Sequence, residues 1–448
     1  MRPYRILWCL LGLALALGAQ DQTQITITGP AKYNTAVPNF NPGAGVPAAV
    51  QDTFNSVLWN DLHQSAVVNL VGRSLYTAPT PAAETDLNNP AVRSAWTAPP
   101  LSIQRLIFGN LQTGGGGLVV EGFLYNVTEL PGSGRLLARR YANPATPAGA
   151  RAVAHQFAND VIAALGFGPG IATSQIAFIS NRSGHKEVWT MDYDGYNQQQ
   201  RTHLNSIAYS PRISPDGQKL AFASFATGRW QIKVLSLLTN KLLPFPTFSG
   251  SLNESPAWSP DGKQLAFASN MNGPLDIFVT DGEGRHLRRL TYSKGGSDSS
   301  PAWNPKPPAG SSGQIAFVSD RAGLPQIYTM NADGSNQQRV ALGGGYAVSP
   351  SWSPNGLSLA FAWVRTGGGE NSGASDVYFW YFGGQNYVQL THNQNRNDFP
   401  SWAPDNRHLV FESGPPYRTQ LFSVAADGSV PMQLTTAGDN EMPNWSWH

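Results

Sequence analysis

The chain of 448 residues holds a single cysteine, Cys9, within an apolar N-terminal stretch. If that stretch is removed as a signal, no thiol remains, which excludes a disulfide, a thiolate metal site and a cysteine nucleophile. An excess of one charge is lacking as well. Without Arg2 and Arg5 of that stretch, the 30 Lys and Arg fall to 28, equal to the 28 Asp and Glu. Balanced charge without basic runs argues against nucleic acid or an anionic membrane as partner.

Long hydrophobic runs are missing after residue 19. Residues 1–19 begin with two arginines, continue with the apolar run 6–17 and end on small residues, the pattern of a signal peptide. This run is too short to span a membrane, and no later stretch is apolar enough. Trp8 precedes Cys9 where lipid attachment needs a small residue. We therefore expect an exported, soluble protein without direct membrane insertion.

Signatures of catalysis are also absent from the sequence. A serine peptidase on an α/β-hydrolase domain needs Gly-x-Ser-x-Gly, and no serine here has glycine both two positions before and two after it. The eight histidines form no His-x-x-x-His or His-Glu pair, which disfavours zinc. Asp192 could open a calcium loop, but the twelfth position of that loop would be His203 instead of glutamate. We predict no enzymatic activity and no catalytic residue.

The chain is rich in a repeated phrase with turn residues, in keeping with its 46 glycines and 34 prolines. In the clearest copy, residues 255–269, a Pro-x-Trp strand is followed by a Pro-Asp-Gly turn and a strand of alternating larger residues and alanines. Copies return every ~43 to ~50 residues with four short strands each, which is typical of propeller blades. The second strands begin at Gln175, Leu220, Leu265, Ile315, Leu359 and Leu409. Six copies predict six blades.

The innermost strands share an aromatic position, with Ile213 as the one exception. The tryptophans at this position are Trp258, Trp303, Trp352, Trp402 and Trp445. We predict that they pack between neighbouring blades, since burying one removes ~150–250 Å² from water. The first copy lacks its own Pro-x-Trp strand, whereas the chain ends on an extra one. We expect the C-terminal strand to pair into the first blade and close the ring.

The fold class is therefore multidomain: a small N-terminal α/β domain followed by an all-β, six-bladed propeller closed by the C-terminal strand. We expect the domain at 20–167, a Gly- and Pro-rich linker at 168–174 and the propeller at 175–448. Alternation and helical spacing of apolar residues predict the elements of the first domain. Its strands are expected at 24–29, 105–110, 118–127 and 134–141, its helices at 50–75 and 148–165, and irregular chain at 76–100.

Several motifs resemble the TolB family, periplasmic proteins of the Tol–Pal system of Gram-negative envelopes. The most specific is Tyr-Asp-Gly-Tyr-Asn-Gln at residues 193–198, and Met-Pro-Asn-Trp-Ser at 442–446 is similar to the closing strand of the family. The repeats around 259–267 are shared more widely among propellers of this WD40-like (PD40) type. The resemblance implies a non-enzymatic protein-interaction scaffold without a cofactor, which serves outer-membrane integrity and cell division.

The resemblance also implies where partners bind. The propeller mouth of the family binds the peptidoglycan-associated lipoprotein Pal, and its mature N-terminus contacts the inner-membrane protein TolA. Transferred by position, the Pal-facing residues are Leu252, Asn253, Glu254, Ser255, Asp298, Ser299, Ser300, Val348, Ser349, Asp398, Phe399, Glu441 and Met442. The TolA-facing segment is Gln20, Asp21, Gln22, Thr23, Gln24, Ile25, Thr26 and Ile27.

Two alternatives stay open. A cation such as calcium could bind in the central channel if Asp298, Asp398 and Glu441 converge there. An exported propeller could instead bind a small ligand or a cell-wall glycan in its channel. The side chains considered for stacking on such a ligand are Trp363, Trp380, Tyr381 and Tyr387, although core packing is the favoured explanation for them.

Overall fold

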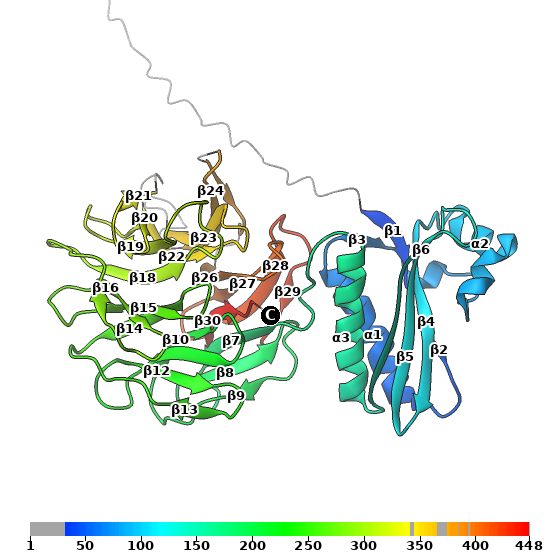
Figure 1. The fold of residues 1–448 in the computed structure, drawn as a ribbon, viewed down its shortest axis with the longest axis horizontal. Helices are drawn as coiled ribbons and strands as arrows, with labels where there is room; N and C mark the ends of the chain where they lie inside the picture. The colour runs from blue at the N-terminus through cyan, green and yellow to red at the C-terminus, as the bar shows by residue number, and fades with distance from the viewer. Residues whose placement is uncertain (1–31, 341–344, 365–373, 385, 393–394, 448) are drawn as a thin grey trace, which may run out of the picture.

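A computed structural model describes residues 32–340, 345–364, 374–384, 386–392 and 395–447. The chain forms an N-terminal α/β part and six four-stranded sheets that radiate from a common centre (Figure 1). Within the described residues, no helix combines the length and the apolar character that crossing a membrane requires. The predicted propeller and its number of blades are confirmed.

The N-terminal part is built on one sheet with the strand order β3-β1-β4-β5-β6, with β2 beside β4. Its strands are β1 Tyr33–Ala36, β2 Asn41–Pro42, β3 Val68–Leu70, β4 Arg105–Gly114, β5 Gly117–Asn126 and β6 Arg135–Pro144. Its helices are α1 Ala48–Gln64, η1 Arg73–Leu75, η2 Glu84–Asn88, α2 Pro90–Thr97 and α3 Pro147–Ala164. Helices α1 and α3 lie between this sheet and the propeller (Figure 1).

Two predictions for this part are wrong. The first helix ends at Gln64 instead of residue 75, because Ala66 adopts a left-handed backbone with φ 58° and the chain then pairs as β3 with β1. The stretch 76–100 is not wholly irregular, since α2 begins where the Asn89 side chain accepts a hydrogen bond from the Ala91 N–H at 2.9 Å. The strand predicted at 24–29 lies outside the described residues.

Six sheets of similar build form the propeller, each with its first strand innermost. The sheet that joins the two ends of the propeller consists of β30 Asn440–Trp445, β7 Gln175–Ser180, β8 Glu187–Asp192 and β9 Gln199–Gln200. The second sheet consists of β10 Ala208–Ile213, β11 Lys219–Ser224, β12 Gln231–Ser236 and β13 Lys241–Leu243. The third consists of β14 Asn253–Trp258, β15 Gln264–Ser269, β16 Asp276–Asp281 and β17 Arg288–Arg289.

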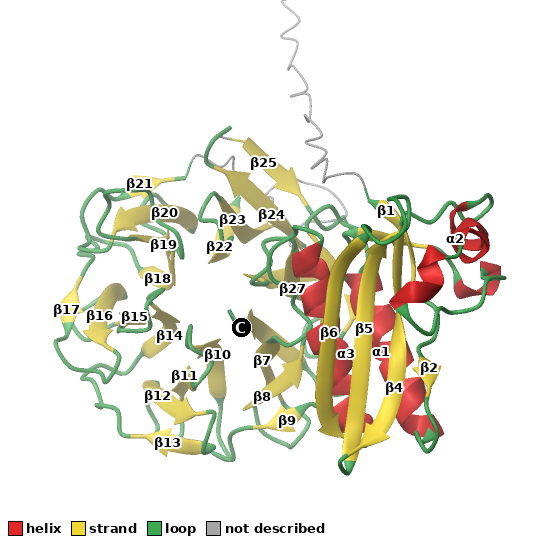
Figure 2. Cartoon of the chain, turned by 45° about the vertical axis from the view of Figure 1, so that its right-hand side comes forward, coloured by secondary structure: helices red, strands yellow, loops and turns green. Residues whose placement is uncertain are grey.

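The remaining three sheets complete the ring (Figure 2). They are β18 Asp298–Trp303, β19 Gln314–Ser319, β20 Gln326–Asn331 and β21 Gln338–Arg339; β22 Tyr346–Trp352, β23 Ser358–Val364, β24 Ser375–Tyr381 and β25 Asn386–Gln389; and β26 Arg396–Trp402, β27 His408–Gly414, β28 Gln420–Ala425 and β29 Met432–Gln433.

The ring is closed by the last strand of the chain, as predicted. Strand β30 pairs antiparallel with β7, with Trp445 opposite Ile176 and Asn440 opposite Ser180. The Trp445 indole N–H donates to the Ser174 hydroxyl at 2.7 Å, and its side chain is 1% exposed. The first and last residues of the propeller therefore share one sheet, which leaves no open blade.

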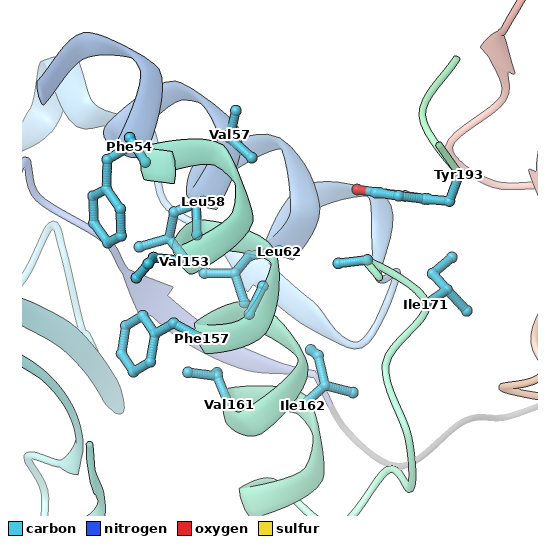
Figure 3. Close-up of a cluster of buried hydrophobic side chains, with 14 of the residues drawn as sticks. Phe54, Val57, Leu58, Leu62, Val153, Phe157, Val161, Ile162, Ile171 and Tyr193 are labelled. Atoms are coloured by element: carbon cyan, nitrogen blue, oxygen red, sulfur yellow. The ribbon is translucent and has the colours of Figure 1, made fainter. Parts of the chain in front are cut away.

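The N-terminal part and the propeller share a hydrophobic core. Phe54, Leu58 and Phe157 of the helices belong to the same buried cluster as Tyr193 and Trp445 of the propeller. Figure 3 shows the Tyr193 side chain extending toward the two helices. Such continuous apolar packing favours one relative position of the two parts.

A polar group lies within this shared core. The buried Asp61 carboxylate accepts a hydrogen bond from the Tyr193 hydroxyl at 2.6 Å and pairs with His155 Nδ1 at 2.7 Å. Burial raises the pKa of Asp61, and both partners oppose that rise. At the edge of the same contact, Arg151 bonds the Asp194 carboxylate at 2.5 and 2.6 Å. The two parts are thus joined by directional bonds in addition to apolar packing.

Trp445→Ala tests the contribution of the closing strand to stability. We expect the free energy of unfolding to fall by ~3–5 kcal/mol, because a fully buried aromatic side chain is lost and a cavity is left. Urea unfolding measures this difference. Trp447→Ala is the matched control, since Trp447 is 37% exposed. Equal stability of the two variants would contradict the role of Trp445 in closing the ring.

Candidate functional site

The six innermost strands lie around a common centre (Figure 2). Their side chains line a central channel with a cavity volume of about 110 Å³. Serines, prolines and tryptophans of these strands line it. All six strands run the same way, so one opening collects their first residues and the other collects the loops that follow their tryptophans. We call the opening at the first residues the mouth.

Each inner strand carries a bulge near the mouth. The residue before the inner-strand proline has φ between 49° and 55° in every blade: Ser210, Ser255, Ser300, Ser349, Phe399 and Met442. The pairing register shifts at each of these positions. A left-handed residue in a bulge bends a strand and redirects side chains. In the sequence, each bulge residue directly precedes the repeated inner-strand proline, but this pattern did not lead to a prediction of the bulge.

Strand alternation divides the predicted partner-binding residues into two rows. The residue two positions before the bulge is 0% exposed in all six blades: Ala208, Asn253, Asp298, Ala347, Asn397 and Asn440. The following residue points to the opposite face of its sheet, and in five of the six blades it is partly exposed at the mouth end of the strand. This mouth row is Tyr209, Glu254, Ser299, Val348, Asp398 and Glu441.

Two predicted partner contacts are therefore wrong. Asn253 bonds the Trp230 carbonyl oxygen at 3.1 Å and accepts from the Ser269 hydroxyl at 2.7 Å. The Asp298 carboxylate accepts bonds from Arg321 Nη2 at 2.7 and 2.9 Å. Asn253 thus links two neighbouring blades, whereas Asp298 is held by an arginine of its own blade. Neither side chain has an exposed surface that a partner could contact.

The other predicted mouth residues differ in exposure. Leu252, Glu254, Ser299, Ser300, Val348, Ser349, Phe399 and Glu441 are partly exposed, whereas Ser255, Asp398 and Met442 are buried. The Asp398 carboxylate accepts from the Ser349 hydroxyl at 2.7 Å, which links two blades below the surface. The N-terminal segment predicted to contact TolA, residues 20–27, lies outside the described residues.

The mouth is acidic. Burial and the negative charges of Glu254, Asp398, Glu412 and Glu441 raise the pKa of Tyr209. Two of these carboxylates are paired with cations: Glu441 with Lys186 Nζ at 2.6 Å, and Asp398 with Arg396 Nη2 at 3.1 Å. Glu254 has no ion-pair partner among the described residues, so the uncompensated negative charge of this opening rests mainly on its carboxylate, which favours a basic group on a partner.

Glu412 is an acidic residue that the sequence analysis missed. Burial, followed by the charge of Asp398, raises its pKa to about 8, and one carboxylate oxygen accepts a bond from the Met442 N–H at 2.8 Å. It lies on the second strand of its blade, where the other five blades have Ala, Val or Ile. A glutamate at a position that is apolar in every other blade was the one sign in the sequence that Glu412 has a special environment.

The residues proposed for a calcium site and for stacking on a channel ligand do not gather in the channel as predicted. Asp298 does not converge with Asp398 and Glu441, and in the described part of the chain no three His, Cys, Asp or Glu side chains form a metal-binding group. Calcium binding in the channel stays a prediction, but Asp298 is no longer among its candidate ligands, and Asp398 and Glu441 remain. The four aromatic residues considered for stacking lie on β23, β24 and β25 and do not line the channel: Trp363, Trp380, Tyr381 and Tyr387. The channel is lined instead by the inner-strand tryptophans and Trp447.

Comparison with known proteins relates the chain to one family. Residues 165–448 match the family described as the TolB beta propeller domain. The Protein TolB homolog of Chlorobium chlorochromatii (strain CaD3) is 34% identical over 258 residues, 57% of this chain and 45% of that protein. The Tol-Pal system protein TolB of Geobacter metallireducens is 31% identical over 217 residues, 48% of each chain. This chain thus spans about half the length of such relatives in these alignments.

A solved structure shows the fold over nearly the whole chain. The crystal structure of TolB from Acinetobacter baumannii superposes with a TM-score of 0.77, at 24% identity, over 93% of this chain and 97% of that one. The match includes both the propeller and the N-terminal part, since it extends beyond the propeller residues.

The raised pKa of Glu412 predicts a pH-dependent stability. A carboxyl group with a folded pKa above its unfolded value of 4.5 binds its proton more tightly in the native state. The stability that it contributes is complete below pH ~4.5 and is lost as the pH rises through about 8. We expect this group to account for a loss of up to ~5 kcal/mol over the window, because each tenfold difference in proton affinity between the two states corresponds to ~1.4 kcal/mol.

Glu412→Gln isolates this contribution, because glutamine is neutral and its oxygen can still accept the Met442 N–H. Urea unfolding at pH 5, 7 and 8.5 should show a smaller loss of stability in the variant than in the wild type. Glu283→Gln serves as the control, since its side chain is 59% exposed on another loop. An identical pH profile for wild type and Glu412→Gln would refute the assignment.

Proposed function

Because the chain belongs to the TolB β-propeller family, we propose that it is a non-enzymatic scaffold of the Tol–Pal system that binds a Pal-like lipoprotein through the propeller mouth. The observation that supports this most directly is the mouth row, in which six blades present side chains at one opening. The relatives are named as TolB proteins of the Tol-Pal system. As part of the same proposal, the protein acts in the periplasm and is exported by residues 1–19.

The mouth suits a folded protein partner. Leu252, Val348 and Phe399 offer partly exposed apolar surface beside the acidic side chains Glu254 and Glu441. An apolar centre with a charged surround is the usual composition of a specific interface, which buries ~1,200–2,000 Å² in total. The bulges and buried polar pairs below the mouth hold these side chains on rigid strands, which lowers the entropy lost on binding.

The N-terminal part leaves the mouth open. It contacts the propeller through loops that follow β8 and β26, as shown by the bonds of Arg151 to Asp194 and of Arg407 to the Phe167 carbonyl oxygen. Both loops lie at the end of the channel opposite the mouth, because β8 and the inner strand β26 run away from the mouth. In this proposal a Pal-like partner and the N-terminal part occupy opposite faces. A TolA-like inner-membrane protein would bind residues 20–27.

Charge reversal in the mouth tests this function. We expect Glu254→Lys and Val348→Arg each to weaken binding of the Pal-like lipoprotein of the same organism at least tenfold, because each places a cation where a basic partner is expected. Calorimetric titration gives the dissociation constants, and the thermal midpoints report whether the variants remain folded.

Glu283→Lys is the matched control, since it makes the same charge change on an exposed loop at the opposite face. Its affinity should equal that of the wild type. Unchanged affinity in both mouth variants, with a wild-type protein that binds, would move the interface elsewhere. If the wild-type protein does not bind the lipoprotein, the proposal that a Pal-like lipoprotein is its partner is wrong.

A further inference from the structure

Arg212 is the only charged side chain in its layer of the channel. It lies on β10, one residue before the tryptophan position, and lines the cavity. The residues in the same layer of the six inner strands are Arg212, Ala257, Ala302, Ser351, Ser401 and Asn444. Because its neighbours in this layer are small or uncharged, the guanidinium has room in the channel and no charged group beside it in the layer.

Arg212 has no counter-ion among the described residues. The hydrogen bond found for its guanidinium joins Nη1 to the Pro211 carbonyl oxygen at 2.8 Å, and no Asp or Glu of the described chain lies within ion-pair distance. Burial lowers its pKa to about 10, so it is still charged at neutral pH. The residue is only partly exposed to the channel, and a cation that is incompletely solvated and has no counter-ion favours an anionic partner.

Hydroxyl groups lie one layer closer to the mouth. Ser210, Ser255 and Ser300 line the cavity at the bulges. Among the described residues, no side-chain hydrogen-bond partner is found for these three hydroxyls. The walls toward the opposite end are apolar and aromatic, with Trp258, Trp447 and the prolines of the turns. The channel therefore combines one cation, several free donors and a hydrophobic wall.

From this arrangement we propose that the channel is a binding site for a small ligand with a single carboxylate group, held by Arg212 and oriented by the serine hydroxyls. The planar guanidinium matches a carboxylate through two parallel hydrogen bonds. One cation balances one negative charge, and the carboxylates of the mouth disfavour a dianion. The cavity volume of about 110 Å³ accommodates a few non-hydrogen atoms beside the aromatic wall. The inference concerns the channel and does not depend on partner binding at the mouth.

The test uses the whole protein and three probes in a buffer without carboxylate. Butyrate represents a free carboxylic acid, N-acetylalanine represents the carboxyl end of a peptide, and inorganic phosphate carries more charge. Binding is followed by calorimetry and by tryptophan fluorescence, since six tryptophans line the channel. We expect at least one carboxylate to bind more tightly than phosphate. The tighter of the two identifies the source of the carboxylate.

Variants locate the site. Arg212→Gln should weaken carboxylate binding at least tenfold, and Arg212→Lys should retain part of the affinity because the charge remains. Arg288→Gln is the matched control, since Arg288 is exposed on β17 and its replacement removes an equal charge. The inference is overturned if neither carboxylate binds the wild-type protein, if phosphate binds more tightly than both carboxylates, or if Arg212→Gln binds as well as Arg288→Gln.

Discussion

The structure depends on one strand pairing, that of β30 with β7, which come from opposite ends of the propeller sequence. Without β30, strand β7 would expose an unpaired edge toward the channel, and the pairing with β30 covers that edge and completes the sixth four-stranded sheet. The same pairing brings Trp445 to Ser174 at the start of the propeller, and Trp445 belongs to the core shared with α1 and α3. The same buried side chain, Trp445, therefore contributes both to closing the ring and to the core that joins the N-terminal part to the propeller.

The inner strands repeat the same local backbone strain in every blade. Six residues adopt a left-handed backbone at the same place in each blade, including Phe399 and Met442, which have bulky side chains. Such conformations cost roughly 1–3 kcal/mol each and persist where the surrounding structure determines them. Here the inner strand is paired with its neighbour on both sides of the bulge, and these hydrogen bonds hold the strained residue in its conformation. The bulge sets which side chains reach the mouth and which lie between blades.

Charge along the channel axis is unevenly distributed. The mouth collects Glu254, Asp398, Glu412 and Glu441 around Tyr209, whereas Arg212 lies deeper without a carboxylate beside it. On a solvated surface, water and salt would screen each of these groups from the others. In the low-dielectric interior of a propeller they raise or lower one another's pKa. The mouth and the deeper channel therefore differ in charge.

The sequence by itself determined the propeller, its six blades and its closure, because turn residues and alternating strands are local signals that repeat along the chain. The partner-binding role of the residues before each Pro-x-Trp strand came from the family resemblance and stays a prediction. Only the tertiary structure decided that Asn253 and Asp298 face the interior while Glu254 and Ser299 face the mouth, since a shift of one residue exchanges the two faces of a strand. The roles of Glu412 and Arg212 depended on what other blades place around them. Burial and charge from distant residues set their chemistry, and no local pattern contains that information.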